Sequence, residues 1–251
     1  MKTSGNTILV TGGTSGIGRA LASEFHDLGN RVIITGRRQE LLDQILSEHA
    51  GMSAYRLDVD DPADIASVAA RVTAEFPDLN VLVNNAGISR AESLVDGEFD
   101  LSVAEALVRT NIMGVLHVTA ALLPVLQRQA TASIVTTTSG LAFVPRANYP
   151  TYCASKAFLH VWLQALRTQL SGRGVEVLEL VPPYVQTELA GPEQARDPNA
   201  MPLVDYIAEV IGIIEDADRP GGEILVDRVK MLRRAEESGR YAETYNRLNG
   251  A

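Results

Sequence analysis

Residues 7–20 read TILVTGGTSGIGRA, and this stretch decides the fold class. The β-branched and aliphatic run at 7–11 is typical of a buried strand. A glycine-rich turn, TGGTSGIG at 11–18, leads directly into a helical pattern that stops at Gly29. In such a turn glycines let the backbone approach a pyrophosphate, and the free N–H groups of the helix N-terminus face it. The stretch therefore predicts a dinucleotide site, with a purely structural turn as the alternative.

Strand and helix patterns alternate along the rest of the chain. Short runs rich in Val, Ile and Leu predict further strands at 31–35, 53–59, 81–87, 132–139, 175–181 and 222–226. Helical patterns stand between them at 39–50, from Pro62 onward, at 99–128 with a late kink or break at Pro124, and at 150–171. This alternation predicts an α/β fold over residues 1–251: one doubly wound, Rossmann-like domain with a seven-stranded parallel sheet and helices on both faces.

Two further segments stand apart from this alternation. The irregular stretch 186–202 contains three prolines and follows the sixth predicted strand, at the sheet edge where ligands bind. We predict a mobile lid there, with a plain surface loop as the alternative. The charged stretch 228–251 has helical spacing and predicts a C-terminal helical extension at the surface or at an interface.

Composition restricts the class of partner. The chain has 251 residues, of which 46% are hydrophobic and 21% are charged, which is enough apolar material for a sizeable core. A net charge of −9 and a pI near 5.0 argue against a nucleic-acid surface and against a basic membrane patch. The single cysteine, Cys153, excludes an intrachain disulfide and is interpreted as a packing residue.

The remaining compositional signals concern location and metals. The first residues do not resemble a secretory signal, and no apolar run reads as long enough to cross a membrane, so we expect a cytoplasmic protein. None of the four histidines has metal-ligand spacing with another ligand, so no metal site is expected.

The end of the second predicted strand indicates which nicotinamide cofactor would bind. An acidic residue at this place would hold the ribose 2′-hydroxyl of NAD. Gly36 stands there instead, followed by Arg37 and Arg38, and a guanidinium can pair with a 2′-phosphate. NADP(H) is therefore favoured over NAD(H), with Arg37 the better candidate because it follows Gly36 directly. In the alternative interpretation, both arginines are the solvated start of a helix.

Tyr152 and Lys156 are the candidate reacting residues. They are four positions apart in a predicted helix and so lie on one face. The phenol has an ordinary pKa of about 10, and a neighbouring lysine cation would stabilise the phenolate and lower that pKa. Ser139 lies 13 positions earlier, at the end of the fifth predicted strand, where its hydroxyl could bond both a substrate oxygen and the tyrosine. The set predicts hydride transfer with Tyr152 as general acid and base.

Together these motifs resemble the short-chain dehydrogenase/reductase family over about residues 7–226, in its single-domain branch. More narrowly, TSGLAFVP, YPTYCASKA and VEVLELVPPYVQTEL resemble the DltE-type oxidoreductases. The resemblance implies a catalytic set of Asn111, Ser139, Tyr152 and Lys156, in which Asn111 anchors a proton-relay water. It also implies a cofactor-binding set, which comprises Gly12, Thr14, Ser15, Gly16, Ile17, Gly18, Arg37, Arg38, Asp58, Val59, Asn85, Ala86, Gly87, Tyr152, Lys156, Pro182, Val185 and Thr187.

The substrate side is less well defined by the sequence. Pro183 stands where the family usually has glycine, so this backbone should be stiffer and the pocket altered. The expected pocket residues are mostly apolar or aromatic and favour an uncharged carbonyl or secondary alcohol; they are Leu141, Phe143, Tyr149, Pro183 and Tyr184. Leu141 and Phe143 could equally pack the core. Arg90 and Arg146 could meet an acidic substrate, but surface positions are favoured for both.

The resemblance implies a homodimer or homotetramer in which the helices at 99–128 and 150–171 pair with those of a second subunit. The function it favours is an NADP(H)-dependent oxidoreductase acting on a small-molecule carbonyl or alcohol. Three alternatives stay open: an NAD-dependent dehydrogenase, an epimerase or dehydratase on the same scaffold, and an NADPH-binding regulatory sensor with little turnover.

Overall fold

The computed structural model describes residues 1–93, 95, 101–216 and 222–250, and within them seven strands form one parallel sheet. The strands lie in the order β3-β2-β1-β4-β5-β6-β7. Their bounds are Thr7–Thr11 (β1), Arg31–Gly36 (β2), Ser53–Arg56 (β3), Val81–Asn84 (β4), Ala132–Thr137 (β5), Val175–Val181 (β6) and Glu223–Leu225 (β7). The predicted doubly wound parallel sheet is confirmed. The strand order reverses at the β1–β4 pair, which is where such sheets form a ligand crevice.

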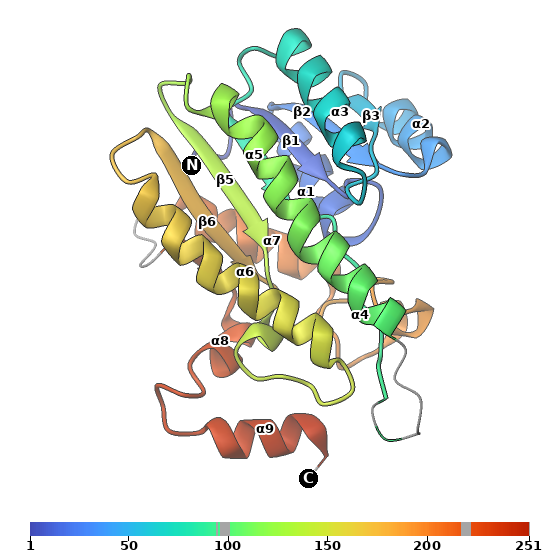
Figure 1. Ribbon diagram of the computed structural model, residues 1–251, viewed down its shortest axis with the longest axis vertical. Helices are drawn as coiled ribbons and strands as arrows, with labels where there is room; N and C mark the ends of the chain where they lie inside the picture. The colour runs from blue at the N-terminus through green and yellow to red at the C-terminus, as the bar shows by residue number, and fades with distance from the viewer. Residues whose placement is uncertain (94, 96–100, 217–221, 251) are drawn as a thin grey trace.

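Helices cover both faces of the sheet, because strands that are apolar on both sides must be buried on both sides (Figure 1). One face carries α1 (Gly16–Asp27), α2 (Gln39–Glu48) and α7 (Leu203–Glu215). The other carries α3 (Pro62–Glu75), α5 (Val115–Leu126) and α6 (Pro150–Gln169). Two separate apolar clusters result, one on each side of the sheet.

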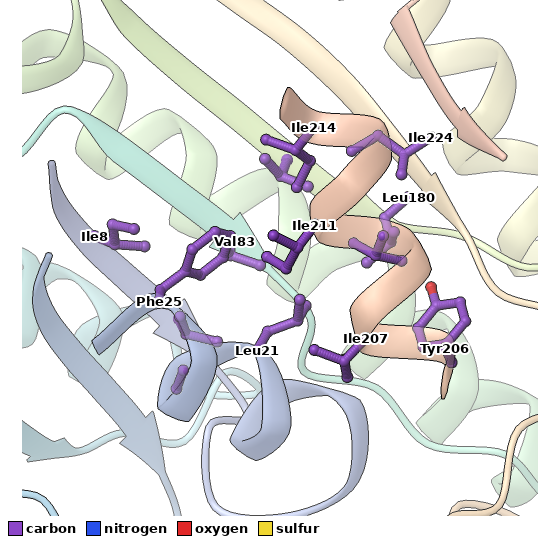
Figure 2. Close-up of a cluster of buried hydrophobic side chains, with 14 of the residues drawn as sticks. Ile8, Leu21, Phe25, Val83, Leu180, Tyr206, Ile207, Ile211, Ile214 and Ile224 are labelled. Carbon is purple, nitrogen blue, oxygen red and sulfur yellow. The ribbon is translucent and has the colours of Figure 1, made fainter. Parts of the chain in front are cut away.

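The cluster under α1 and α7 shows how the helices are attached (Figure 2). Leu21 and Phe25 of α1 are 1% exposed, and Ile207 and Ile211 of α7 pack with them against strand residues such as Val83. Positions four apart on each helix point to the same side, which is the amphipathic pattern that attaches a surface helix to a core. Burial of each of these large side chains contributes about 1.5–3 kcal/mol.

The helical stretch predicted at 99–128 is continuous where it is described, although it changes geometry. It consists of α4 (Leu101–Val108), a π-helical turn (Arg109–Gly114) and α5, and Pro124 lies inside α5 two residues before its end. By length and composition, Leu101–Leu126 could cross a membrane, with mean hydropathy 1.5 and 44% of the window buried in the protein. The expectation that no apolar stretch reaches this length is therefore wrong. Core helices of soluble proteins pass the same test, and α5 packs here against α3.

The C-terminal extension forms α8 (Asp227–Arg233) and α9 (Tyr241–Asn249). Figure 1 shows both helices below the carboxyl ends of β5 and β6, close to the segment that joins β5 to α6. Gly140 in that segment contacts Val229 and Leu232 of α8 so closely that an added Cβ would lie 2.8 Å from each of them. The extension therefore packs directly onto the chain that follows Ser139.

Candidate active site

A cleft of about 820 Å³ lies at the carboxyl ends of the strands, around the point where the strand order reverses. Segments that follow β1, β2, β4, β5 and β6 contribute to its wall. The predicted site residues that line it are Gly12, Thr14, Ser15, Gly16, Ile17, Arg37, Arg38, Val59, Asn85, Ala86, Gly87, Ser139, Leu141, Tyr149, Tyr152, Lys156, Pro182, Pro183, Tyr184, Val185 and Thr187. Residues that lie far apart in the sequence thus come together in one cleft.

Four predicted site residues do not line the cleft. Gly18 lies behind the glycine turn, Asp58 accepts a hydrogen bond from the Asp60 backbone at 3.1 Å, and Asn111 is fully buried. Phe143 was expected in the substrate pocket and is turned away from it, because its ring packs edge-on against His160, with centroids 4.7 Å apart, and lies under the Arg233 guanidinium.

The glycine turn has the geometry that a phosphate site needs. Gly12 has φ +66°, and a Cβ there would lie 2.9 Å from Ala86 Cα. At Gly18 a Cβ would lie 2.4 Å from the Gly12 carbonyl oxygen, so only glycine lets α1 start this close to the turn. The α1 N-terminus has no acidic residue in its first turn, and the N-cap Ser15 makes no side-chain capping bond. Its first N–H groups are therefore free to bind an anion in the cleft.

These features fit a dinucleotide. In addition, Thr35 lines the cleft at the end of β2, and its hydroxyl is buried without a hydrogen-bond partner. A buried hydroxyl without a hydrogen-bond partner is unusual in a folded protein, and it is expected where a bound ligand supplies the missing hydrogen bond. Arg37 and Arg38 follow on the same rim, both exposed.

The end of β4 is bonded to the end of β1. The Thr11 hydroxyl accepts hydrogen bonds from the backbone N–H groups of Asn85, at 3.0 Å, and Ala86, at 3.1 Å. The Asn85 side chain donates back to the Thr11 carbonyl oxygen at 3.3 Å. These bonds hold the 85–87 segment against the glycine turn, so the two form one rigid wall of the cleft.

Tyr152, Lys156 and Ser139 converge on the cleft from two elements. Tyr152 and Lys156 lie one turn apart on α6, and Ser139 follows β5. The Lys156 Nζ donates a hydrogen bond to the Thr137 carbonyl oxygen at 2.9 Å and lies 5.8 Å from the centroid of the Tyr152 ring. Ser139 accepts a bond from the Leu141 N–H at 3.1 Å, which fixes its side chain at the start of a short 3₁₀ turn.

Burial dominates the electrostatics of this pair. It raises the pKa of Tyr152 to about 12, although the hydrogen bond with Ser139 lowers it in part. It lowers the pKa of Lys156 from 10.5 to about 8. The expectation that Lys156 lowers the tyrosine pKa is therefore not met in the protein alone, because burial of the phenol raises the pKa of Tyr152 above its ordinary value. The pKa of Tyr152 rises and the pKa of Lys156 falls, and both shifts favour the uncharged form of the side chain.

Asn111 stands behind this pair, on the π-helical turn. Its Oδ1 accepts from the Ile88 N–H at 2.9 Å, and its Nδ2 donates to the Ile88 carbonyl oxygen at 3.0 Å and to Ser155 Oγ at 3.1 Å. Ser155 in turn donates to the Tyr152 carbonyl oxygen at 2.7 Å. π-Helical turns recur at functional sites. Here the turn places the Asn111 amide between Ile88, in the segment that follows β4, and Ser155 of α6.

The predicted lid is tied down in this structure. Gln194, in a 3₁₀ turn, donates to the Val185 carbonyl oxygen at 2.8 Å and to Thr187 Oγ1 at 3.1 Å, and accepts from the Ala190 N–H at 2.9 Å. Gln194 lines the cleft together with Glu188 and Leu189 of the same segment. The sequence did not single out Gln194, because a buried glutamine in a loop has no recognisable spacing.

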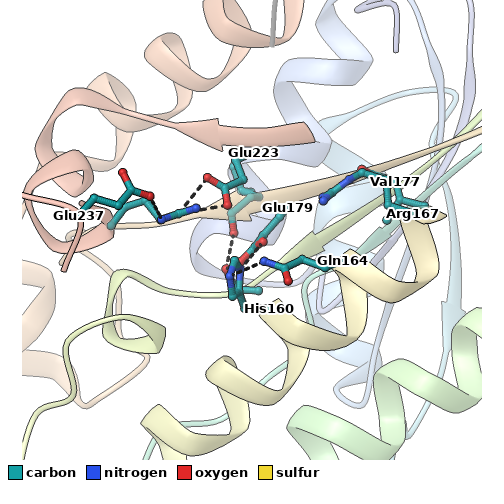
Figure 3. Close-up of polar contacts among 10 residues, drawn as sticks. His160, Gln164, Arg167, Val177, Glu179, Glu223 and Glu237 are labelled. Carbon is teal, nitrogen blue, oxygen red and sulfur yellow. Dashed lines mark hydrogen bonds and ion pairs between the residues drawn. The ribbon is translucent and has the colours of Figure 1, made fainter. Parts of the chain in front are cut away.

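A buried polar cluster lies on the side of α6 that faces β6 (Figure 3). Glu179 is 0% exposed, accepts from the Thr138 hydroxyl at 2.8 Å, and lies 2.8 Å from His160 Nδ1. Glu223 on β7 pairs with Arg233 through both carboxylate oxygens, at 3.0 and 2.9 Å. Such a buried carboxylate is tolerated because it is hydrogen-bonded and paired.

Two groups in the described residues hold three side chains that could ligate a metal: His160 with Glu179 and Glu223, and His26 with Asp27 and His49. Sequence spacing indicated neither group, because residues distant in sequence meet in space. The expectation that the protein holds no metal stays a prediction. In the first group, hydrogen bonds and the Arg233 pair already engage the carboxylates.

The sequence also missed cleft residues from other parts of the chain. Arg90 and Arg146, both favoured as surface residues, line the cleft, as do Leu232 of α8 and Leu248 of α9. No local pattern marks any of them, because their place depends on how distant segments pack.

The buried lysine leads to a pH-dependent stability. Lys156 loses its proton near pH 8 when folded but near 10.5 when unfolded, so between these values the unfolded chain binds more protons and the free energy of unfolding rises with pH. We expect the wild type to gain about 3 kcal/mol relative to Lys156→Met across this interval. Urea unfolding of the cofactor-free proteins at a series of pH values measures the difference. Parallel pH profiles for the two proteins would contradict the buried, shifted lysine.

Comparisons with known proteins agree with this geometry. A family model described as short chain dehydrogenase matches residues 6–198. An uncharacterized oxidoreductase DltE of Bacillus subtilis is 37% identical over 251 residues, with 99% of this chain and 98% of that protein covered. A short chain dehydrogenase from Burkholderia cenocepacia, solved in complex with NADP, shares the fold with a TM-score of 0.84 at 23% identity over 99% of both chains. A serine dehydrogenase solved in a closed form with NADP+ has a TM-score of 0.76 at 29% identity, covering 82% of this chain and 88% of its own. The chain therefore belongs to the short-chain dehydrogenase/reductase family of oxidoreductases.

Proposed function

We propose that this protein is an NADP(H)-dependent oxidoreductase that interconverts a carbonyl group and an alcohol, with Tyr152 as general acid and base. One observation carries the proposal: Ser139, Tyr152 and Lys156 meet in the cleft that also holds the free N-terminus of α1. When bound, the nicotinamide supplies the hydride. The residues of the chain supply the binding, the orientation and the proton.

The phenol proton of Tyr152 passes to the carbonyl oxygen as the alcohol forms. Burial keeps Tyr152 protonated at neutral pH, which is the state a proton donor needs. Ser139 orients the same oxygen, since its hydroxyl already bonds with Tyr152. Lys156, 5.8 Å from the centroid of the tyrosine ring, stabilises the phenolate that remains. We assign Asn111 to positioning through Ile88 and to the anchoring of a relay water.

We infer that the glycine turn with the α1 N-terminus binds the pyrophosphate, and that Arg37, with Arg38, binds a 2′-phosphate. Support for NADP over NAD comes from the acid-free end of β2 and from the NADP+ bound by the serine dehydrogenase relative. The other predicted cofactor residues take the roles that the family resemblance implies. Segment 186–202 acts as the lid, because Glu188, Leu189 and Gln194 line the cleft from it.

A homo-oligomer is part of the proposal. In the described residues, Leu101 and Val108 of α4 and Phe158 and Val161 of α6 are large apolar side chains between 41% and 64% exposed. The two helices pack against each other, because Leu107 of α4 belongs to the same apolar cluster as Tyr152 and Cys153 of α6. Exposed apolar side chains on two neighbouring helices are typical of an interface between subunits.

The first test concerns the reaction. Replacement of Tyr152 by Phe removes the proton donor, and we expect the rate of NADPH oxidation with a carbonyl panel, followed at 340 nm, to fall by about a hundredfold or more. NADPH binding, measured by fluorescence, should remain. The exposed Tyr241→Phe serves as the matched control. If the wild type binds NADPH tightly and reduces no carbonyl, the sensor alternative is favoured instead.

The second test concerns the cofactor. Arg37→Ala removes a cation from the proposed 2′-phosphate site, so the KM for NADPH should rise roughly tenfold while the KM for NADH stays constant. Arg38→Ala, assayed in parallel, shows which arginine carries the contact. Equal effects on the two cofactors would exclude a 2′-phosphate role for the residue that was changed.

The third test concerns assembly. Val161 is 64% exposed on the α6 surface, and a charge there would be buried in the proposed interface. Val161→Glu should therefore convert the oligomer to monomers in light scattering coupled to size exclusion. Val204→Glu is the control, because Val204 is 74% exposed on α7, on the opposite side of the sheet. A monomeric wild type at micromolar concentration would contradict the proposal.

A further inference from the structure

Apart from Tyr152 and the residues proposed to bind the cofactor, the cleft is lined by apolar, aromatic and charged side chains. Leu141, Tyr149 and Tyr184 line it, together with Leu232 and Leu248 of the C-terminal helices. These side chains suit the hydrocarbon part of a substrate. Because α8 and α9 contribute two of them, the C-terminal extension forms part of the pocket and not only an outer surface.

Arg146 is the charged member of this wall. Its guanidinium lies 5.8 Å from the centroid of the Tyr149 ring, and among the described residues it donates no hydrogen bond and forms no ion pair. Arg90 also lines the cleft, but its Nη1 donates to the Ser89 carbonyl oxygen at 3.1 Å. An arginine held over an aromatic ring with its donors unused presents a planar, bidentate site for a carboxylate.

Nearby carboxylates do not occupy this site. Asp197 receives hydrogen bonds from the Asn199 N–H at 2.8 Å and from Asn199 Nδ2 at 3.0 Å, and a further one from Tyr184. Asn199 contributes most to the lowered pKa of Asp197, and the charge of Arg146 adds a smaller part from a distance. Glu188 and Glu193 line the cleft from the 186–202 segment, and neither forms an ion pair with Arg146 within the described residues.

The backbone of Arg146 is held on every side. Its N–H donates to Cys153 Sγ at 3.4 Å, and its carbonyl oxygen accepts from the Tyr149 N–H at 3.0 Å. Asn249, at the end of α9, clamps both neighbours: its Oδ1 accepts from the Ala147 N–H at 2.7 Å, and its Nδ2 donates to the Pro145 carbonyl oxygen at 3.2 Å. The guanidinium therefore extends from a fixed point, six residues before Tyr152 in the chain.

We propose, building on the carbonyl–alcohol function above, that the substrate is a small oxo acid or hydroxy acid. Its carboxylate pairs with Arg146, its hydrocarbon part lies against Leu232 and Leu248, and its carbonyl oxygen faces Tyr152. Asn249 is a positioning residue that acts through the backbone on either side of Arg146. An anionic substrate thus replaces the uncharged one that the sequence favoured.

The test compares acids with their own neutral esters. A series of aliphatic 2-, 3- and 4-oxo acids and their methyl esters is assayed with NADPH on the wild type, Arg146→Gln and Arg146→Lys. We expect at least one acid to exceed its ester in kcat/KM. For that acid, Arg146→Gln should lower kcat/KM by about tenfold to a hundredfold, mainly through KM, while leaving the ester unchanged. Arg146→Lys keeps a positive charge, so its kcat/KM for the acid should lie between the values of Arg146→Gln and the wild type.

Two further variants separate binding from folding. Asn249→Ala should lower kcat/KM for the acid by a smaller factor in the same direction, at an unchanged melting temperature. Arg173→Gln is the matched control. Arg173 lies on the exposed turn before β6, at the end of the strands opposite to the cleft, so kcat/KM should stay unchanged for both acid and ester. Equal losses for acid and ester in Arg146→Gln, or reduction of neutral carbonyls with no preference for any acid, would overturn the inference and leave the proposed function standing. Failure of the wild type to reduce any carbonyl, neutral or acidic, would overturn both.

Discussion

The hydroxyl of Thr11 holds together the two strands on which the cleft depends. It accepts N–H bonds from Asn85 and Ala86 and so joins the carboxyl ends of β1 and β4, where the strand order of the sheet reverses. The Asn85 side chain adds bonds to the Thr11 and Gly12 carbonyl oxygens, at 3.3 and 3.4 Å. Together these bonds join the glycine turn and the 85–87 segment into one wall close to the free end of α1, which is the preorganisation that anion binding needs.

Tyr152 and Lys156 show what burial does to the charge states of side chains in such a cleft. Tyr152 and Lys156 are 7% and 5% exposed, and burial moves their pKa values toward their neutral forms, upward for the phenol and downward for the amine. A protein selected for stability alone would leave both in water. Their burial instead makes them responsive to a charge or hydrogen bond that arrives with a ligand, because electrostatic interactions are stronger in a medium of low dielectric constant.

The C-terminal helices contribute to the cleft wall. The family model ends at residue 198, yet α8 packs under Gly140, and Leu248 of α9 reaches the cleft. Asn249 bonds to both neighbours of Arg146, so the last turn of the described chain controls where a pocket cation lies. Ser139, Tyr152 and Lys156 are thus placed by elements of the sheet fold, whereas part of the cleft wall depends on a segment that the sheet does not require.

The amino-acid sequence alone was enough to predict the parallel sheet, the glycine turn and the common helix face of Tyr152 and Lys156, because these depend on local periodicity and on short spacings. That Ser139 meets this pair follows from the way β5 and α6 pack. The sequence also predicted that the loops at the carboxyl ends of the strands meet, and the cleft lies there, since the carboxyl ends of parallel strands share an edge. It could not place Phe143, which turns away toward His160 and Arg233, nor Arg146, nor the groups gathered around Glu179. Ala147 and Asn249 are 102 positions apart in the chain, and only packing brings the Ala147 N–H within 2.7 Å of Asn249 Oδ1. The tertiary structure also decided that the pKa of Tyr152 is raised and not lowered, because the direction depends on how much water the folded chain excludes from the phenol.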